Sequence, residues 1–241
     1  MTEKEKMREI VIPGETIVSG DDYLPGEGTE KQGKDIIAMK YGLAEEQSRL
    51  VKIIPLSGTY SPRRGNVIIG KVEELTFNGW VLDIDTPERA FLSLMEVPRY
   101  VNKDALEEVM DLGDMVVAKI WSINKRGIDL SIKSRGLGKI EEGMIIEVNP
   151  NKVPRIIGKE GSMISLIKDE TGCNITVGQN GFIWIKGAKI EDELLAKKAI
   201  LFIVERSFIS GLTEEVNKWF GGQIKSATAS VKDTEPKEDK K

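Results

Sequence analysis

Short apolar stretches separated by turn-forming residues run through the first sixty positions of the chain. Each stretch spans two to five residues and is followed by a segment that contains Gly or Pro. Apolar runs of this length between turn formers predict β-strands. The stretches are Ile10–Ile12, Thr16–Val18, Tyr23–Leu24, Asp35–Met39 and Leu50–Ile54. We therefore expect a small all-β domain at residues 1–61, whose acidic surface suits a protein partner.

The second region, residues 62–138, shows the alternation of half-buried strands. Trp80, Leu82 and Ile84 occupy every second position, so they share one face of a strand. The preceding Asn78-Gly79 predicts a hairpin with a type I′ turn, because both central residues of that turn need positive φ. Five strands with a short helix before the fourth match the plan of an OB barrel. The expected strands are Val67–Val72, Trp80–Asp85, Arg89–Leu92, Met115–Trp121 and Ile128–Lys133, and the expected helix is Lys103–Met110.

The third region, residues 139–220, predicts the order strand, helix, helix, strand, strand, helix. This is the order of a eukaryote-type KH domain, and the loop Gly158–Gly161 falls between its first two helices. The fold class is therefore multidomain, mainly β plus α+β. Residues 221–241 are polar and predict a disordered tail, because they bury too little apolar area to offset ordering. The expected strands are Gly143–Val148, Asn174–Val177 and Phe182–Lys186, and the expected helices are Val153–Ile157, the segment after Gly161 and Ile190–Ser207.

Composition narrows the chemistry that the chain can perform. It contains no histidine and one cysteine, which removes the commonest general base, an internal disulfide and a multi-cysteine zinc site. We predict no catalytic residues, no metal and no cofactor. No apolar run reaches the roughly 18 residues that a membrane helix needs. The charged start, Met1–Lys6, predicts no signal peptide, so we expect a cytoplasmic protein.

The net charge of −4 is distributed unevenly. Residues 1–30 hold eight acidic and three basic groups, a net of −5, so the other 211 residues carry +1. Basic residues concentrate at 47–72 and 119–139. Such patches can bind phosphate while the whole chain stays acidic.

The second region resembles the RNA-binding OB domain named after the largest protein of the small ribosomal subunit. The matching segments are Gly65–Val72, Phe77–Ile84, Leu112–Ile120 and Asp129–Lys133. The resemblance implies that aromatic and basic residues on one barrel face bind single-stranded RNA, and bases stack on aromatic rings irrespective of sequence. The sequence leaves open whether Trp80 faces RNA or the barrel core. The candidate RNA-binding residues are Phe77, Trp80 and Phe91, with Arg63, Arg64, Lys71, Lys133 and Arg135 near the phosphates.

The glycine loop of the third region is a second candidate RNA contact. Gly158 and Gly161 let backbone approach a sugar-phosphate chain that a β-carbon would obstruct, and the following helix presents free amides to an anion. KH domains hold about four nucleotides with this loop. Glu160 departs from the pattern, because an acid beside phosphate opposes binding, and a KH fold retained as a scaffold is the alternative. The candidate residues here are Lys152, Arg155, Gly158, Lys159 and Gly161.

The chain as a whole resembles the KH-bearing cap subunit of the archaeal RNA exosome, the ribosomal-RNA-processing protein four family. The resemblance rests on Val11–Glu15, on Asn78-Gly-Trp80, on Gly178–Trp184 and on the order of the three domains. It implies a non-catalytic RNA-binding subunit, present in three copies on a ring of RNase PH-like subunits. The ring would be contacted by the amino-terminal domain, and the cap could include the sister cap protein that ends in a zinc ribbon. RNA would be captured and threaded, 3′ end first, into this phosphorolytic exoribonuclease.

Two other classes of protein are alternatives. A nuclease in its own right would use Asp83 and Asp85, or Asp21 and Asp22, as metal ligands, although a solvated strand face explains the first pair more simply. A transcription or translation factor with an OB–KH pair is the other alternative.

Overall fold

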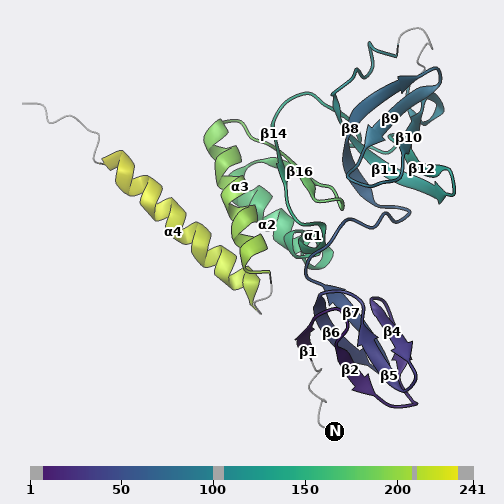
Figure 1. Ribbon diagram of the computed structural model, residues 1–241. Coiled ribbons are helices and arrows are strands. Elements are labelled where there is room, and N and C mark those ends of the chain that lie inside the picture. The colour runs from purple at the N-terminus through teal and green to yellow at the C-terminus, as the bar shows by residue number, and fades with distance from the viewer. Residues whose placement is uncertain (1–7, 100–105, 208–210, 233–241) are drawn as a thin grey trace, which may run out of the picture. The chain divides into compact units, whose positions relative to one another are not determined.

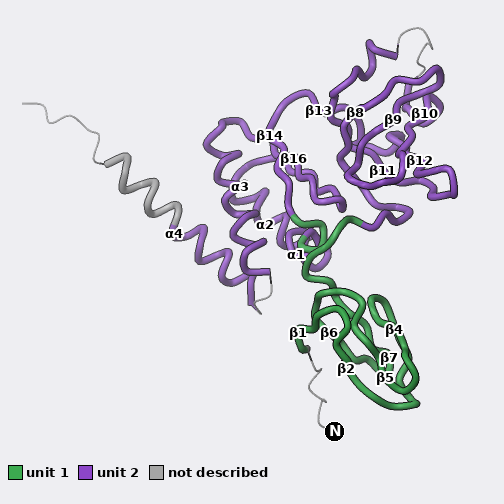
Figure 2. Tube along the Cα trace, viewed as in Figure 1, with its two compact units in different colours: residues 1–60, 149–152 green, residues 61–148, 153–241 purple. Residues whose placement is uncertain are grey.

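The structure is a computed structural model that describes residues 8–99, 106–207 and 211–232 (Figure 1). The chain forms two compact units, residues 1–60 with 149–152 and residues 61–148 with 153–241 (Figure 2). The charged start Met1–Lys6 and the last nine positions of the predicted tail lie outside the described residues. Within the described ranges, no helix is long and apolar enough to cross a membrane.

The first unit consists of two small sheets, ordered β1-β6-β7-β3 and β2-β5-β4. Val11, Ala38, Ala44 and Ile53 form its core cluster. All five predicted stretches fall on strands, while β4 and β6 were not expected because their residues are largely polar. The strands are β1 (Arg8–Val11), β2 (Thr16–Ser19), β3 (Leu24–Pro25), β4 (Thr29–Gln32), β5 (Asp35–Ala38), β6 (Gly42–Gln47) and β7 (Leu50–Pro55).

The second unit begins with a closed five-stranded barrel, which confirms the predicted OB-like fold. Its sheet runs β12-β10-β9-β8-β11, and pairing of β12 with β11 closes it. The β10–β12 pair is parallel, and the other pairs of the barrel are antiparallel. A sixth strand, β13 (Gly138–Ile140), adds to β11. The barrel strands are β8 (Val67–Thr76), β9 (Gly79–Asp83), β10 (Ala90–Ser93), β11 (Met115–Asn124) and β12 (Gly127–Ser131), with a 3-10 turn at Leu94–Glu96.

The hairpin between β8 and β9 forms as predicted, but its turn lies one residue earlier. Thr76 pairs with Gly79, so the two turn residues are Phe77 and Asn78. Neither is among the described non-glycine residues with positive φ, so the expected type I′ turn at Asn78-Gly79 is wrong. A β-carbon on Gly79 would lie 2.1 Å from the carbonyl oxygen of Leu92, so glycine is needed here for close strand approach.

The helix predicted at Lys103–Met110 falls partly outside the described residues. Its described part, residues 106–110, is a turn in which the amides of Val109 and Met110 donate to the carbonyl of Leu106.

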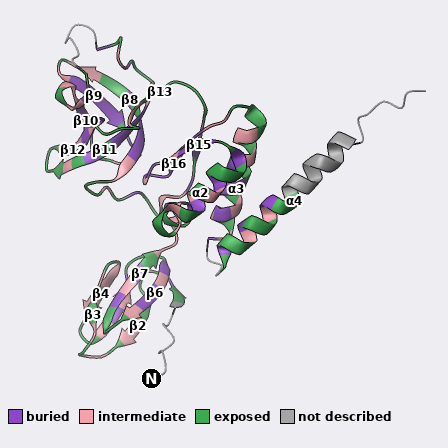
Figure 3. Cartoon of the chain, turned by 180° about the vertical axis from the view of Figure 1, so that it is seen from behind, coloured by how far each residue is buried: buried purple, intermediate pink, exposed green. Residues whose placement is uncertain are grey.

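The rest of the second unit is the KH domain, with the predicted order of elements. A three-stranded antiparallel sheet, β14-β16-β15, packs with α1, α2 and α3 around one apolar core (Figure 3). The elements are β14 (Met144–Glu147), a 3-10 turn (Pro150–Lys152), α1 (Val153–Ile157), a 3-10 turn (Lys159–Gly161), α2 (Ser162–Thr171), β15 (Asn174–Val177), β16 (Phe182–Lys186) and α3 (Ile190–Glu205).

The predicted disordered tail is wrong for its first twelve residues. Helix α4 (Leu212–Lys232) continues from the KH domain to Lys232. Val216 and Phe220 are buried in the KH core, and Trp219 contacts Phe202 of α3 with ring centroids 5.5 Å apart. The apolar first half anchors the helix, and alanine, serine and lysine beyond it are compatible with its extension.

The turn Gly178–Gly181 joins the KH domain to the barrel. Asn180 is 1% exposed, and its side-chain amide bonds three backbone groups of the barrel: the amide of Ile69 (3.2 Å), the carbonyl of Ile69 (2.8 Å) and the carbonyl of Ile84 (3.2 Å). Gln179 exchanges two bonds of 2.8 Å with Val67, accepting through Oε1 and donating through its own amide. The turn therefore pairs with β8 beyond the point where β9 ends, and it fixes the two domains as one unit.

Candidate nucleic-acid interface

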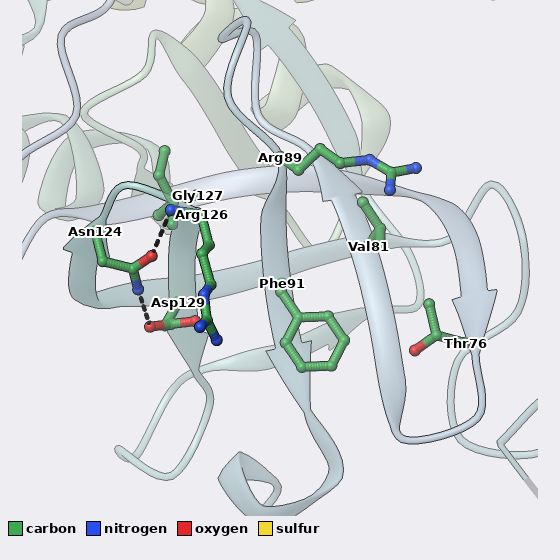
Figure 4. Close-up of a pocket in the computed structure, with 9 residues that line it drawn as sticks. Thr76, Val81, Arg89, Phe91, Asn124, Arg126, Gly127 and Asp129 are labelled. Atoms are coloured by element: carbon green, nitrogen blue, oxygen red, sulfur yellow. Dashed lines mark hydrogen bonds between the residues drawn. The ribbon is translucent and has the colours of Figure 1, made fainter.

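The outer face of the barrel carries a hollow of about 460 Å³ (Figure 4). It lies where OB folds bind oligonucleotides, on the face of the second and third strands between the first and the fourth connecting loops. Here those are β9, β10 and the loops after β8 and β11. The lining residues are Thr76, Val81, Arg89, Phe91, Asn124, Arg126, Gly127, Ile128 and Asp129.

Phe91 provides the aromatic surface of this hollow. It sits on β10, opposite Val81 of β9 and Asp129 of β12, so all three side chains project from the same face. The half-buried ring extends toward Gly79, where a β-carbon would lie 3.0 Å from Phe91 Cζ. Phe77, at the neighbouring hairpin tip, is 82% exposed. Of the predicted aromatics, Phe91 therefore lines the hollow and offers a surface that a base can stack on, while Phe77 is exposed at the tip of the hairpin.

The polar wall of the hollow is built by the loop between β11 and β12. Asn124 Nδ2 donates to Asp129 Oδ2 (2.9 Å), and Asn124 Oδ1 accepts from the backbone amide of Arg126 (2.8 Å). These bonds brace the loop, and the Arg126 side chain extends alongside Asp129 in the lining of the hollow (Figure 4). Across the hollow, Arg89 Nη2 bonds Glu74 Oε2 at 2.5 Å. The site thus combines a ring, a fixed amide–carboxylate pair and guanidinium groups.

Trp80, a candidate RNA-binding residue from the sequence, is buried in the barrel. Its side chain is 0% exposed, and its indole Nε1 donates to the carbonyl of Met110 at 2.8 Å. The turn at Phe77-Asn78 fixes the register that directs Trp80 inward with Leu82 and Ile84. Its ring belongs to the barrel core and is not available to a base.

The predicted basic residues of the barrel are exposed, but none of them lines the hollow. Lys71 lies opposite Asp83 on β9. Lys133 Nζ bonds Glu96 Oε1 at 3.0 Å, and Arg135 is exposed beyond the end of β12. Hydrogen bonding from Ser131, aided by Lys133, lowers the pKa of Glu96 below its ordinary value of 4.5. Lys133 is thus already paired with a carboxylate of the protein itself.

Arg63 and Arg64 form the turn that precedes β8. The guanidinium of Arg64 lies 5.4 Å from the ring centroid of Trp121, which is within cation–π distance. Asp83 and Asp85, considered above as metal ligands, are both exposed, and Asp83 Oδ1 accepts from the Asp85 amide at 3.0 Å. That bond gives Asp83 a local role in ending β9.

The KH glycine loop has the conformation that its glycines predict. Gly158 has φ of 75°, and a β-carbon there would lie 2.7 Å from Met163 Cβ. Gly161 caps α2 at φ of 82° with no side-chain cap, so the first amides of the helix have no side-chain acceptor from the capping residue. Glu160 adopts φ of 54°, the left-handed region, and is exposed. Arg155 and Lys159 are exposed on either side of Gly158.

Lys152, the remaining candidate of the KH group, belongs with residues 149–152 to the first compact unit. It is half-buried.

Sequence reasoning did not select Arg89, Asn124 and Arg126 as site residues. The signal was present in Asn124-Lys-Arg-Gly127, a turn sequence with two cations between two predicted strands. Weighting the connecting loops of an OB barrel, rather than its strands alone, would have found this side of the hollow.

Similarity to known proteins agrees with this architecture. A family model described as a KH domain matches residues 143–191. The chain is 38% identical over 215 residues to the exosome complex component Rrp4 of Methanothermus fervidus, covering 89% of this chain and 96% of that protein. It is 39% identical to the Rrp4 of Methanobrevibacter smithii (87% and 70% covered) and 36% identical to that of Thermococcus kodakarensis (91% and 88% covered). A crystal structure assigned as an exosome complex RNA-binding protein is similar with a TM-score of 0.63 and 33% identity, covering 70% of this chain and 99% of that one.

A closed OB-like barrel joined to a KH domain defines a modular protein of the nucleic-acid-binding class. Within that class, the identity and coverage above assign a particular family. The chain belongs to the Rrp4 family of exosome complex components.

Proposed function

We propose that this protein is a non-catalytic, RNA-binding cap subunit of the archaeal exosome, which captures RNA and guides its 3′ end into a phosphorolytic ring exoribonuclease. The observation that carries the proposal is the hollow on the barrel, where Phe91 provides a stacking surface and Arg126 a cation. The relatives named above are exosome complex components, and the similar crystal structure is assigned as an RNA-binding protein of that complex.

An exposed apolar row on the first unit supports docking to a protein ring. Ile10, Leu43 and Ile54 lie opposite one another on β1, β6 and β7, so they share one face of the sheet. Ile10 is 57% and Ile54 42% exposed, and the nearby Ile12 and Tyr41 are exposed as well. Exposed apolar patches of this kind mark protein interfaces. The proposed partner is the ring of RNase PH-like subunits, with three copies of this chain per ring, alone or together with the zinc-ribbon cap protein, in the cytoplasm.

The proposal is tested by incubating a 3′-tailed, 5′-labelled RNA with phosphate and Mg²⁺. We expect the purified chain alone to leave the RNA intact. Addition of the chain to the ring subunits should accelerate shortening from the 3′ end. Degradation by the chain alone would refute the non-catalytic role. Recovery of ribosomes or RNA polymerase without ring subunits, in a pull-down from an archaeal extract, would favour a transcription or translation factor instead.

The share of the KH loop in RNA binding is tested by combining Arg155→Glu with Lys159→Glu. Both side chains are exposed, so the fold should be retained. If the loop contacts phosphate, affinity for RNA falls and its salt dependence becomes weaker, because fewer counterions are released. An affinity equal to the wild type at low salt would assign the KH domain to scaffolding, with the barrel as the binding surface.

A further inference from the structure

Trp121 is an exposed aromatic residue that the hollow does not include. It is 54% exposed on β11, directly after Ile120, which is fully buried in the barrel core. The register of β11 against β12 shifts between Ile120 and Ser122, which makes Trp121 the extra residue of a β-bulge. Bulges of this kind redirect a side chain out of the regular alternation. The fold therefore presents the largest side chain of β11 to solvent.

The indole of Trp121 has no fixed polar partner in the described part of the protein. By contrast, the indole nitrogens of Trp80 and Trp184 donate to the backbone carbonyls of Met110 and Glu142. Those two rings are oriented by the protein itself. The Trp121 ring is left with an exposed surface and an unused N–H donor.

The backbone holds Arg64 beside this ring. In the turn Arg63–Asn66 the amide of Asn66 donates to the carbonyl of Arg63. The same turn is held against β11 by two hydrogen bonds to Ile120, since the Gly65 amide donates to the Ile120 carbonyl (2.7 Å) and the Ile120 amide to the Asn66 carbonyl (2.8 Å). Within the described ranges, no carboxylate forms an ion pair with Arg64. A cation and an aromatic ring are thus fixed next to each other with the cation free to meet an anion.

The position of this pair relates it to the hollow. Ser122, the residue after Trp121, pairs with Asp129. Asn124 lies three residues after Trp121 on β11, which is about 10 Å at strand spacing. Both Asn124 and Asp129 line the hollow. OB folds bind single strands over about 4–16 nucleotides, more than one hollow of this volume accommodates. A single RNA strand that leaves the hollow and runs along β11 therefore reaches Trp121 next.

We propose that Trp121 and Arg64 form a second nucleotide-stacking station for single-stranded RNA, adjoining the hollow on the barrel. A base stacks on the exposed indole, and the Arg64 guanidinium binds the phosphate that accompanies it. The proposal rests on the proposed function, because it extends the same RNA-binding face. The surrounding charge favours nucleic acid over an apolar protein segment: Lys119 and Lys125 are the charged residues of β11 and its following loop nearest to Trp121, and both are exposed.

The test measures the affinity of full-length protein for labelled oligoribonucleotides of about 4 and about 16 nucleotides, the two ends of the range for one OB fold. Fluorescence anisotropy is recorded for Trp121→Ala, Trp121→Phe and Arg64→Ala, with Phe91→Ala for the hollow and Leu194→Ala on α3 as a matched exposed apolar control. For the long RNA, Trp121→Ala should weaken binding by about 5- to 150-fold, which corresponds to the loss of one stacked base. Trp121→Phe should retain most of the affinity, and Arg64→Ala should lower the salt slope by about one unit.

The short RNA separates the two stations. We expect it to occupy the hollow, so Phe91→Ala should weaken its binding while Trp121→Ala leaves it within about 2-fold. Unchanged binding of the long RNA by Trp121→Ala, with a clear loss in Phe91→Ala, would overturn the second station and leave the proposed function intact. If the wild-type protein binds neither RNA, both proposals fail. If Trp121→Ala binds RNA normally but no longer assembles with the ring, the surface is a protein interface and the proposal is overturned.

Discussion

Replacing Asn180 by alanine should loosen the barrel from the KH domain. The side chain makes three hydrogen bonds to the backbone of Ile69 and Ile84 and is 1% exposed. Each such bond contributes about 0.5–1.5 kcal/mol net, so the loss of three, with their partners left buried, should cost about 3 kcal/mol of unfolding free energy. At about 2–4 °C per kcal/mol for a unit of this size, the melting temperature should fall by about 6–12 °C.

The measurement is urea unfolding monitored by circular dichroism, together with the hydrogen-exchange rate of the Ile69 amide. Asn180→Asp should destabilise more than Asn180→Ala, because a carboxylate has no hydrogen to donate and would face two carbonyl oxygens. Gln179→Ala, which removes one half-exposed side-chain bond, should cost about 1 kcal/mol. Asn174→Ala, an exposed position on β15, should stay within about 0.5 kcal/mol of the wild type. If Asn180→Ala behaves like Asn174→Ala, the turn does not hold the two domains together, and the reasoning fails.

Gly79→Ala should destabilise the protein by about 1–3 kcal/mol in urea unfolding, because its β-carbon would lie 2.1 Å from the Leu92 carbonyl. Gly221→Ala in α4, where the space is open, should instead stabilise by up to about 1 kcal/mol; equal effects would contradict the strand-approach argument. Stability should also decrease in acid. The folded pKa of Glu96 lies below its ordinary 4.5, so its contribution is complete above that pH and is lost as the pH falls through the folded value. Glu96→Gln should flatten the pH profile of the melting temperature in this window, and an unchanged slope would rule out that contribution.

The strands of the barrel and the order of the KH elements were predictable because they depend on local periodicity. Alternation over a few residues, and glycines between helices, report the element in which they occur. The orientation of Trp80 was not predictable in the same way. It depends on whether the turn comprises Phe77-Asn78 or Asn78-Gly79, and a slip of one residue moves a whole strand to the other face.

Turn chemistry explains the misplaced hairpin. A tight two-residue turn with positive φ at both positions does occur in the protein, but at Ser48-Arg49 between β6 and β7, without the Asn-Gly signal. There the tertiary pairing of the two strands overrides the preference of the turn residues. At Asn78-Gly79 the glycine is required for a different reason, the approach of β10.

The hollow itself was only half predictable. Phe91 could be proposed from its residue type. Arg126 is brought beside it by the parallel pairing of β10 with β12, in which Ala90 pairs with Ile128, 38 positions later in the chain. Such nonlocal pairing leaves no periodic signal in either segment. The helical start of the predicted tail was missed because its helix, α4, begins earlier, at Leu212, and is anchored there by Val216 and Phe220 in the KH core.

The first compact unit is discontinuous in sequence, because residues 149–152 complete what residues 1–60 begin. A gene fragment that stops at codon 60 would therefore encode an incomplete unit. Recombination could transfer this unit to another protein intact only by carrying the later segment with it, and that segment lies between β14 and α1 of the KH domain. No single continuous stretch of the sequence therefore encodes the amino-terminal unit alone.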